Sequence, residues 1–141
     1  MWRGADIFGG SVLKSSKMKN VFAALAVMIL SVPFAMAADG DMTGEELTAL
    51  FGAGKKINLG GDGEGYSGSL DIKGDGTASG SVQVQGKTIP VEGTWTINQN
   101  RFCRKWRAID AGAEVCEVWN KIGDGRVAAL VNGKKVGVNW W

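Results

Sequence analysis

The sequence predicts a mainly β fold, a small antiparallel β-barrel of about eight strands preceded by one short α-helix. Two observations support this prediction. From residue 55 onward, short runs of alternating or β-branched residues are separated by turns that contain glycine, and a single segment with helical periodicity precedes them. A closed barrel is favoured over a sandwich because closure removes exposed strand edges, which a domain of this size has little material to cover.

Residues 18–37 have the three parts of a secretory signal peptide. A short basic start with Lys19 precedes an apolar run over 21–32, and a small-residue site follows at 35–37. The run has about a dozen residues whereas a bilayer span needs ~20, so we expect cleavage after Ala37 rather than a retained anchor. We interpret residues 1–17 as a non-native upstream extension and residues 38–141 as a single exported domain, periplasmic or extracellular.

Removal of the leader changes the charge balance. Of the 16 basic and 14 acidic residues, four basic and one acidic lie before residue 38, which leaves 12 basic and 13 acidic in the exported domain. The basic residues of 101–107 are followed by Glu114 and Glu117, which indicates a solvated hairpin of mixed charge. We therefore expect no nucleic-acid partner. We also expect no stable membrane insertion after signal cleavage, because strands such as 77–85 are too polar to face lipid.

The first expected element of the domain is a helix. Thr43 and Glu46 have the spacing of a capping box, with the threonine at the N-cap. One apolar face follows and comprises Leu47, Leu50 and Phe51. A glycine at 52 or 54 ends the helix after about two to three turns.

The remaining elements are strands separated by turns. We expect strands at 55–59, 66–72, 77–85, 87–97, 101–107, 114–122, 126–131 and 134–140. Asn132-Gly133 is the strongest hairpin signal, because a type I′ turn needs positive φ at both central residues. Pro90 lies inside an expected strand and therefore marks an edge or a bulge.

The two cysteines, Cys103 and Cys116, favour a disulfide in an exported chain of this size. If they lie opposite each other in one hairpin, Lys105 lies opposite Glu114 on the same face. The other face then carries Phe102, Trp106, Val115 and Trp119 together with Arg104 and Glu117. This pattern is typical of a core face with an embedded charge pair. The alternative is that the pair lies in water at the barrel mouth, where it contributes only ~0–1 kcal/mol.

The chain contains no histidine, which excludes Ser-His-Asp and Cys-His nucleophiles, a histidine base and His-ligated zinc. Enzymes of carboxylate or Ser-Lys type stay open, but acidic residues such as Asp62 and Glu64 lie in glycine-rich, turn-like segments. Residues 63–68 formally match a dinucleotide fingerprint, but strands and not a helix follow. We expect no catalytic residue, no metal site and no cofactor.

Tryptophan is frequent after the leader, where Trp95, Trp106, Trp119, Trp140 and Trp141 occur. The first three are expected to fill the core, because a small domain needs their large buried area; a ligand cavity or an exposed binding patch is the alternative. Adjacent strand residues point to opposite faces, so at most one of Trp140 and Trp141 belongs to the core. The other is a candidate for a partner surface.

Several short motifs together resemble a family of small exported bacterial proteins of unknown function. They are Thr43-Gly44-x-Glu46-Leu47, Leu50-Phe51, Asp75-Gly76-Thr77, Gly93-Thr94-Trp95, Phe102-Cys103-x-x-Trp106 and Cys116-x-Val118-Trp119. The resemblance implies a compact, disulfide-linked, calycin-like barrel and carries no established activity. The motif at 93–95 is also similar to the glycine-x-tryptophan of lipocalin-like barrels. In those barrels it lies in the first strand, so its position in the middle of this chain argues against a lipocalin ligand role.

These observations favour a non-enzymatic binding module for a small apolar ligand or a partner protein. An inhibitor of a secreted protease or lysozyme and a small carboxylate or Ser-Lys enzyme are the alternatives. The candidate binding residues are Trp106, Trp119, Arg104, Glu117, Trp140 and Trp141. A filled barrel would favour a surface-binding role, and a cavity with converging polar groups would favour a ligand.

Overall fold

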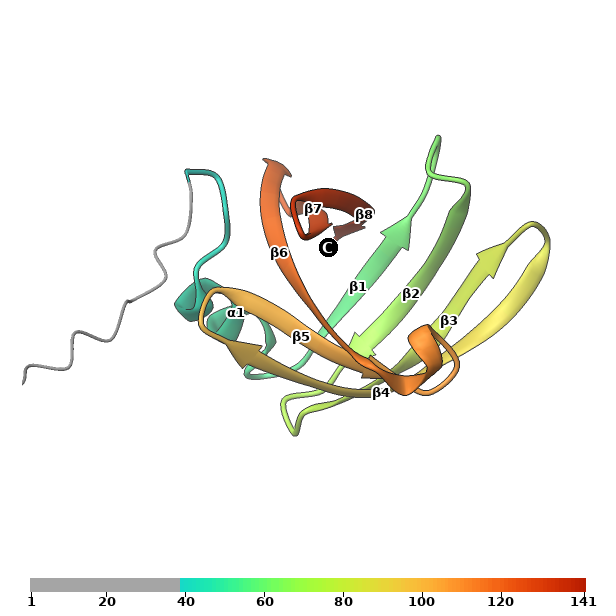
Figure 1. Ribbon diagram of the computed structural model, residues 1–141, viewed down its shortest axis with the longest axis horizontal. Coiled ribbons are helices and arrows are strands. Elements are labelled where there is room, and N and C mark those ends of the chain that lie inside the picture. Colours follow the sequence, from blue (N-terminus) through green and yellow to red (C-terminus); the bar gives the residue numbers. More distant parts are fainter. Residues whose placement is uncertain (1–38) are drawn as a thin grey trace, which may run out of the picture. The chain divides into compact units, whose positions relative to one another are not determined.

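The computed structural model describes residues 39–141, and the predicted signal peptide and upstream extension lie outside these residues. Eight antiparallel strands form a closed barrel in which each strand neighbours the next in sequence (Figure 1). One helix, α1 (Gly44–Phe51), precedes the strands. The strands are β1 (Lys55–Gly60), β2 (Tyr66–Ile72), β3 (Thr77–Val84), β4 (Lys87–Asn98), β5 (Arg101–Trp106), β6 (Glu114–Gly123), β7 (Arg126–Val131) and β8 (Lys134–Trp140). The predicted fold class is confirmed, and the barrel is consistent with a calycin-like fold.

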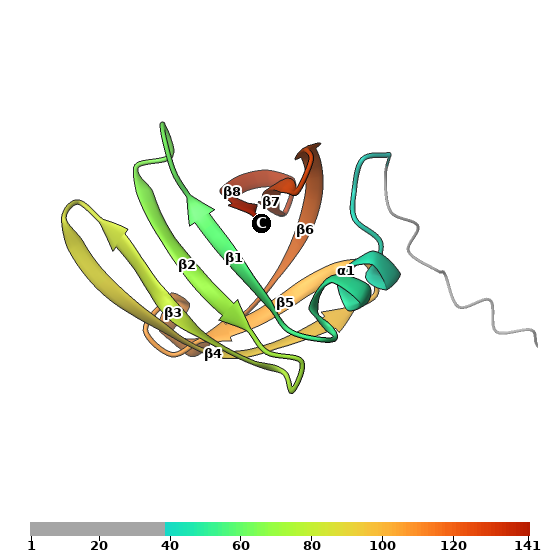
Figure 2. The same ribbon diagram turned by 180° about the vertical axis from the view of Figure 1, so that it is seen from behind.

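Helix α1 begins with the predicted capping box. The Thr43 side chain accepts a hydrogen bond from the Glu46 N–H, and the Glu46 carboxylate accepts one from the Thr43 N–H. Both Leu47 and Phe51 are buried, while the backbone N–H of Gly44 donates to Asn100 Oδ1 at 2.8 Å. This bond ties the helix to the turn between β4 and β5, so α1 lies across one end of the barrel (Figures 1 and 2).

Two predicted features of the strands are confirmed. Asn132 and Gly133 both have positive φ, 51° and 75°, in the turn between β7 and β8. Among the described residues, β4 pairs with β5 only from Gly93 onward, so the segment around Pro90 has a neighbouring strand on one side only. Pro90 therefore lies at a local edge, where its missing N–H leaves no ladder bond unmade.

The hairpin of β5 and β6 has the predicted register. Cys103 lies opposite Cys116 and forms a disulfide with it. On the same outer face, Lys105 lies opposite Glu114, and their charged groups are 4.0 Å apart. The disulfide is compatible with an oxidising, exported location. In residues 39–141, no helix is both long and apolar enough to cross a bilayer.

Aromatic side chains fill the end of the barrel that α1 covers. The Phe51 ring lies 5.3 Å from Phe102, 5.4 Å from Trp119 and 5.6 Å from Trp95, measured between ring centroids. Trp119 is completely buried, and Trp141 stacks on it at 6.4 Å. This cluster supplies the large buried area that the tryptophan content predicted. The opposite end of the barrel is not filled in this way.

Candidate functional site

The barrel contains a cavity of about 250 Å³ between the aromatic cluster and the tips of the β1–β2 and β3–β4 hairpins. Phe102 belongs both to the cluster and to the cavity lining and forms the floor. Apolar side chains from β1, β2, β3 and β4 make most of the wall and include Ile57, Leu59, Leu70, Val82, Val84 and Val91. Ile109 and the exposed Val136 also line it. The cavity therefore favours a ligand that is mainly apolar.

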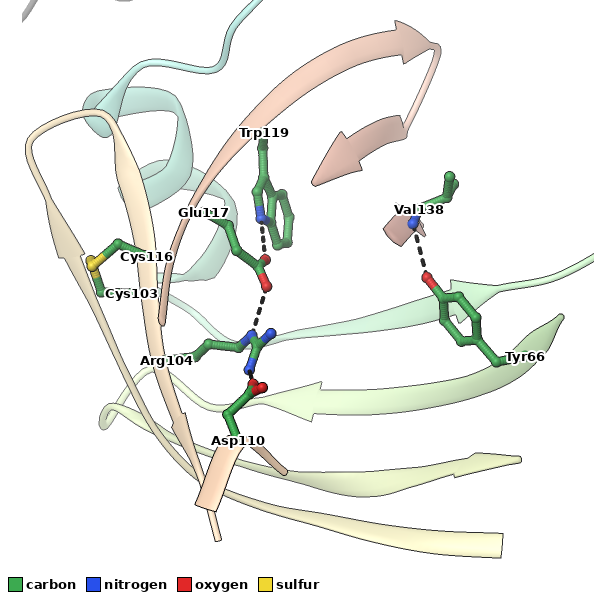
Figure 3. Close-up of polar contacts among 8 residues, drawn as sticks. All are labelled: Tyr66, Cys103, Arg104, Asp110, Cys116, Glu117, Trp119 and Val138. Atoms are coloured by element: carbon green, nitrogen blue, oxygen red, sulfur yellow. Dashed lines mark hydrogen bonds and ion pairs between the residues drawn. A yellow bond between two sulfur atoms is a disulfide. The ribbon is translucent and has the colours of Figure 1, made fainter. Parts of the chain in front are cut away.

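One side of the cavity carries a connected chain of charged groups (Figure 3). Arg104 Nε donates to Glu117 Oε1 at 2.6 Å, and Trp119 Nε1 donates to Glu117 Oε2 at 3.0 Å. Arg104 Nη1 also donates to Asp110 Oδ2 at 2.8 Å. The arginine thus has a buried carboxylate on one side and the half-exposed carboxylate of Asp110 on the other.

The charge pair of Arg104 and Glu117 lies inside the barrel and not in water. Their side chains are only 14% and 7% exposed. Burial by itself lowers the pKa of Arg104, but the negative charge of Glu117 and the hydrogen bonds to both carboxylates together raise it. Arg104 is therefore charged at neutral pH. The guanidinium also lies 5.8 Å from the centre of the Trp106 ring, a cation–π distance.

The segment that supplies Asp110 is a short 3₁₀ turn, η1 (Asp110–Gly112), between β5 and β6. Asp110 and Ala111 both have positive φ, 55° and 53°. Alanine rarely adopts this conformation, which costs about 1–3 kcal/mol for residues other than glycine. The ion pair with Arg104 helps to hold this turn in place at the rim of the cavity, where Ile109 lines the opening.

Two further polar side chains of the lining, Tyr66 and Asn139, come from β2 and β8. The Tyr66 hydroxyl oxygen accepts a hydrogen bond from the Val138 N–H at 3.0 Å (Figure 3). Asn139, the next residue of β8, is only 7% exposed. The two strands flank β1, so these groups lie across the barrel from the charged groups of β5 and β6.

The structure separates the six predicted binding residues into three groups. Trp106, Arg104 and Glu117 line the cavity, whereas Trp119 lies below it in the core and positions Glu117. Trp141 is partly buried against the core, and Trp140 is 40% exposed on the outer surface. One terminal tryptophan thus packs inward and its neighbour faces outward, as their alternation predicted.

Two interpretations of charged residues need correction. The 101–107 segment was expected to be part of a solvated hairpin, but Arg104 faces the interior because its position on β5 alternates with Cys103 and Lys105. The alternative placement of Arg104 and Glu117 in water at the mouth is likewise wrong, since Glu117 is buried and the Arg104 side chain is only 14% exposed. The remaining basic side chains of the hairpin are solvated, as shown by Arg107, which is 81% exposed.

Sequence reasoning did not identify Tyr66, Asn139 and Asp110 as part of a site. Tyr66 and Asn139 are 73 positions apart in the chain and meet only because β8 closes the barrel against β1. Asp110 lies in a connecting turn whose path no local pattern predicts. The alternation of the last strand gave no signal for Asn139, because Val136, Val138 and Trp140 form its apolar set and Asn139 falls between them.

No protein-family model matches the chain, and neither a curated protein nor a solved structure shows significant similarity to it. The function therefore has to be argued from the cavity itself.

Proposed function

We propose that this protein is a non-enzymatic binding module that holds a small, mainly apolar ligand in the open end of its barrel. The observation that carries the proposal is the cavity of about 250 Å³, whose wall is mostly aliphatic and whose floor is aromatic. A cavity of ~150 Å³ lined by apolar residues already accepts benzene. The space here suits a molecule somewhat larger than a single aromatic ring.

The distribution of packing supports this proposal. The α1 end of the barrel is filled by five aromatic rings, whereas the opposite end keeps its space although large apolar residues line it. The small residue Ala129, at an interior position, helps to keep that space open. Close packing is the rule in protein interiors, so an unfilled apolar volume indicates a place for a ligand.

The state of Glu117 supports a non-enzymatic role. Each of its carboxylate oxygens already accepts a hydrogen bond, one from Arg104 and one from Trp119. Each oxygen keeps a further lone pair, but a general base must be directed at the proton that it removes, and both oxygens are directed at groups of the protein itself. A carboxylate held in this way is better suited to supporting the cavity wall than to catalysis.

A partner protein is the second candidate, and one version of it is the inhibition of a secreted hydrolase. The specific observation in its favour is Trp140, which is 40% exposed on the outer face of β8. Tryptophan is enriched at the centres of protein interfaces. In this version the disulfide-linked barrel serves as a rigid support, and the cavity plays no part in recognition.

The proposal also includes an exported state: a signal peptide, a periplasmic or extracellular location, and membership of the family of small exported proteins. The disulfide between Cys103 and Cys116 is compatible with an exported location, and the eight-stranded barrel is consistent with a calycin-like fold. Both features agree with what the resemblance implies.

A blocked-cavity variant tests the ligand proposal. Val84 lines the cavity, whereas its neighbour Gln83 is exposed on the outside of β3. We expect Val84→Trp to weaken binding of cumene, a branched aromatic hydrocarbon without polar groups, by at least about tenfold, because the new ring occupies the ligand space. Gln83→Trp should bind cumene as the unaltered protein does.

Binding is followed by the NMR chemical shifts of backbone amides around the cavity. Absence of cumene binding to the unaltered protein, or equal binding by the two variants, would refute the ligand proposal and leave the partner-protein candidate.

A further inference from the structure

Asn139 presents an amide to the cavity that no group of residues 39–141 hydrogen-bonds. The residue is 7% exposed and lines the cavity, and no hydrogen bond to its side chain occurs within residues 39–141. No buried side-chain nitrogen or oxygen of the described residues lacks a hydrogen-bond partner, so the amide atoms of Asn139 are accessible to solvent from the cavity. The amide is therefore free to hydrogen-bond with a molecule that enters the mainly apolar cavity.

Tyr66 adds a hydrogen-bond donor beside this amide. Its oxygen accepts the N–H of Val138, so its own hydrogen is left to donate, and no acceptor for it is found in the described part of the chain. The hydroxyl approaches β8 closely because residue 137 is glycine, where a side-chain carbon would overlap the hydroxyl oxygen. Gly137 therefore lets the Tyr66 hydroxyl reach the backbone N–H of Val138, the residue before Asn139, and both Tyr66 and Asn139 line the cavity.

The ionisable residues of the lining leave no free charge for a charged ligand. They are Tyr66, Arg104 and Glu117. Arg104 is paired with Glu117 inside the barrel and with the half-exposed Asp110 at the rim. An anion would have to displace one of these carboxylates. A cation would find the buried carboxylate already paired, and desolvation of an unpaired ion is costly.

We propose that the cavity binds an uncharged, mainly apolar molecule whose polar group is a carboxamide or a group with equivalent donors and acceptors, held by Tyr66 and Asn139. The Tyr66 hydroxyl donates to the ligand carbonyl oxygen, and the Asn139 amide both donates to the ligand and accepts from it. The apolar part of the ligand then extends across the cavity toward Phe102. This inference rests on the proposed ligand-binding function and specifies its chemistry.

Four probes of nearly the same size and shape test this proposal: benzamide, benzoate, benzamidinium and cumene. They share one phenyl ring and differ in whether the attached group is a neutral amide, an anion, a cation or a hydrocarbon. We expect the protein to bind benzamide at least about tenfold more tightly than either ion, because neither ion finds a free counter-charge. Affinities come from NMR titration of the backbone amides of Gly137 and Val138.

Asn139→Leu removes the amide and keeps the branched shape of the side chain. We expect it to weaken benzamide binding by about tenfold and to leave cumene binding unchanged or slightly tighter. The variant should be at least as resistant to urea as the unaltered protein, because it replaces an unpartnered amide with an apolar group. Tyr66→Phe provides the second measurement and should also weaken benzamide selectively.

The outcomes test the amide recognition and the ligand-binding function separately. If cumene binds but the two variants do not change benzamide affinity relative to cumene, the proposed amide recognition is wrong and the ligand-binding function stands. Binding of benzoate or benzamidinium as tight as that of benzamide would also overturn the uncharged class. If none of the four probes binds, both the recognition and the function proposed above fail.

Discussion

Replacing Glu117 with glutamine removes one negative charge from the wall of the cavity and changes the shape of the side chain very little. In the folded protein, one carboxylate oxygen accepts from Arg104 Nε at 2.6 Å and the other accepts from Trp119 Nε1 at 3.0 Å. Glutamine offers one carbonyl oxygen and one amino group. Either the Arg104 N–H or the Trp119 N–H must therefore face the amino group of the glutamine, which is itself a donor.

The expected loss follows from these contacts. A hydrogen bond to a charged group contributes ~1.5–3 kcal/mol, and a buried donor left without an acceptor costs ~1–3 kcal/mol. Breaking a fully buried ion pair costs ~3–5 kcal/mol, but Asp110 stays on Arg104 and compensates part of its charge. We expect Glu117→Gln to lower the free energy of unfolding by about 3 kcal/mol.

Urea denaturation followed by tryptophan fluorescence measures this loss, with the disulfide intact. A slope of ~1.5 kcal/mol per M for a domain of this size gives a fall of about 2 M in the unfolding midpoint. Asp110→Asn is the matched control, because it alters the carboxylate on the exposed side of the same arginine. Its side chain is 42% exposed, so we expect a loss of no more than ~1 kcal/mol.

This reasoning would be refuted if the free energy of unfolding of Glu117→Gln lay within about 0.5 kcal/mol of that of the unaltered protein, because effects this small are typical of surface ion pairs. Such a result would mean that water reaches the pair in solution. A loss for Asp110→Asn as large as that for Glu117→Gln would instead place the main counter-charge of Arg104 at the rim.

Two further predictions concern the surface and the helix. Trp140→Ala should lower the free energy of unfolding by no more than about 1.5 kcal/mol, because the side chain is 40% exposed and its indole N–H makes one bond, to the Gly60 carbonyl. Trp119→Ala, at a fully buried position, should lower the free energy of unfolding by ~3–5 kcal/mol in the same urea assay. An equal loss for Trp140→Ala would show that Trp140 belongs to the core. The pKa of Glu46 lies below its ordinary value of 4.5, first because the carboxylate accepts a hydrogen bond from Lys121 and then because it accepts one from the Thr43 N–H. The ionised side chain therefore stabilises the folded protein above pH 4.5, and this contribution is lost as the pH falls through the lowered pKa. Glu46→Gln should accordingly be less stable than the unaltered protein at pH 7, with a difference that shrinks below pH ~4; a difference independent of pH would contradict this assignment.

The elements of the fold were predictable because their signals are local. The capping box of Thr43 and Glu46 begins α1, and Asn132-Gly133 forms the turn that positive φ requires. Alternation within single strands placed one tryptophan of the terminal pair inward and the other outward. The disulfide register also follows from one hairpin, because two cysteines at opposite positions determine every other pair between the two strands.

The site depended on contacts that no local pattern describes. Alternation placed Arg104 and Glu117 on the inner face, but their burial depends on how the rest of the barrel surrounds that face. Tyr66 meets β8 because the last strand closes against β1 through Asn58 and Leu59. Whether the interior is filled or hollow follows from the summed volumes of side chains from all eight strands.

The sequence by itself determined the single helix, the order and nearly the bounds of the strands, and the disulfide, because hydrogen bonding along the backbone and side-chain alternation act over a few residues. Only the tertiary structure decided that one end of the barrel is packed with aromatic rings while the other encloses a cavity of about 250 Å³. It also placed the unpartnered amide of Asn139 in that cavity. Burial and desolvation depend on the packing of residues that are distant in the chain, so these properties arise only when the barrel closes.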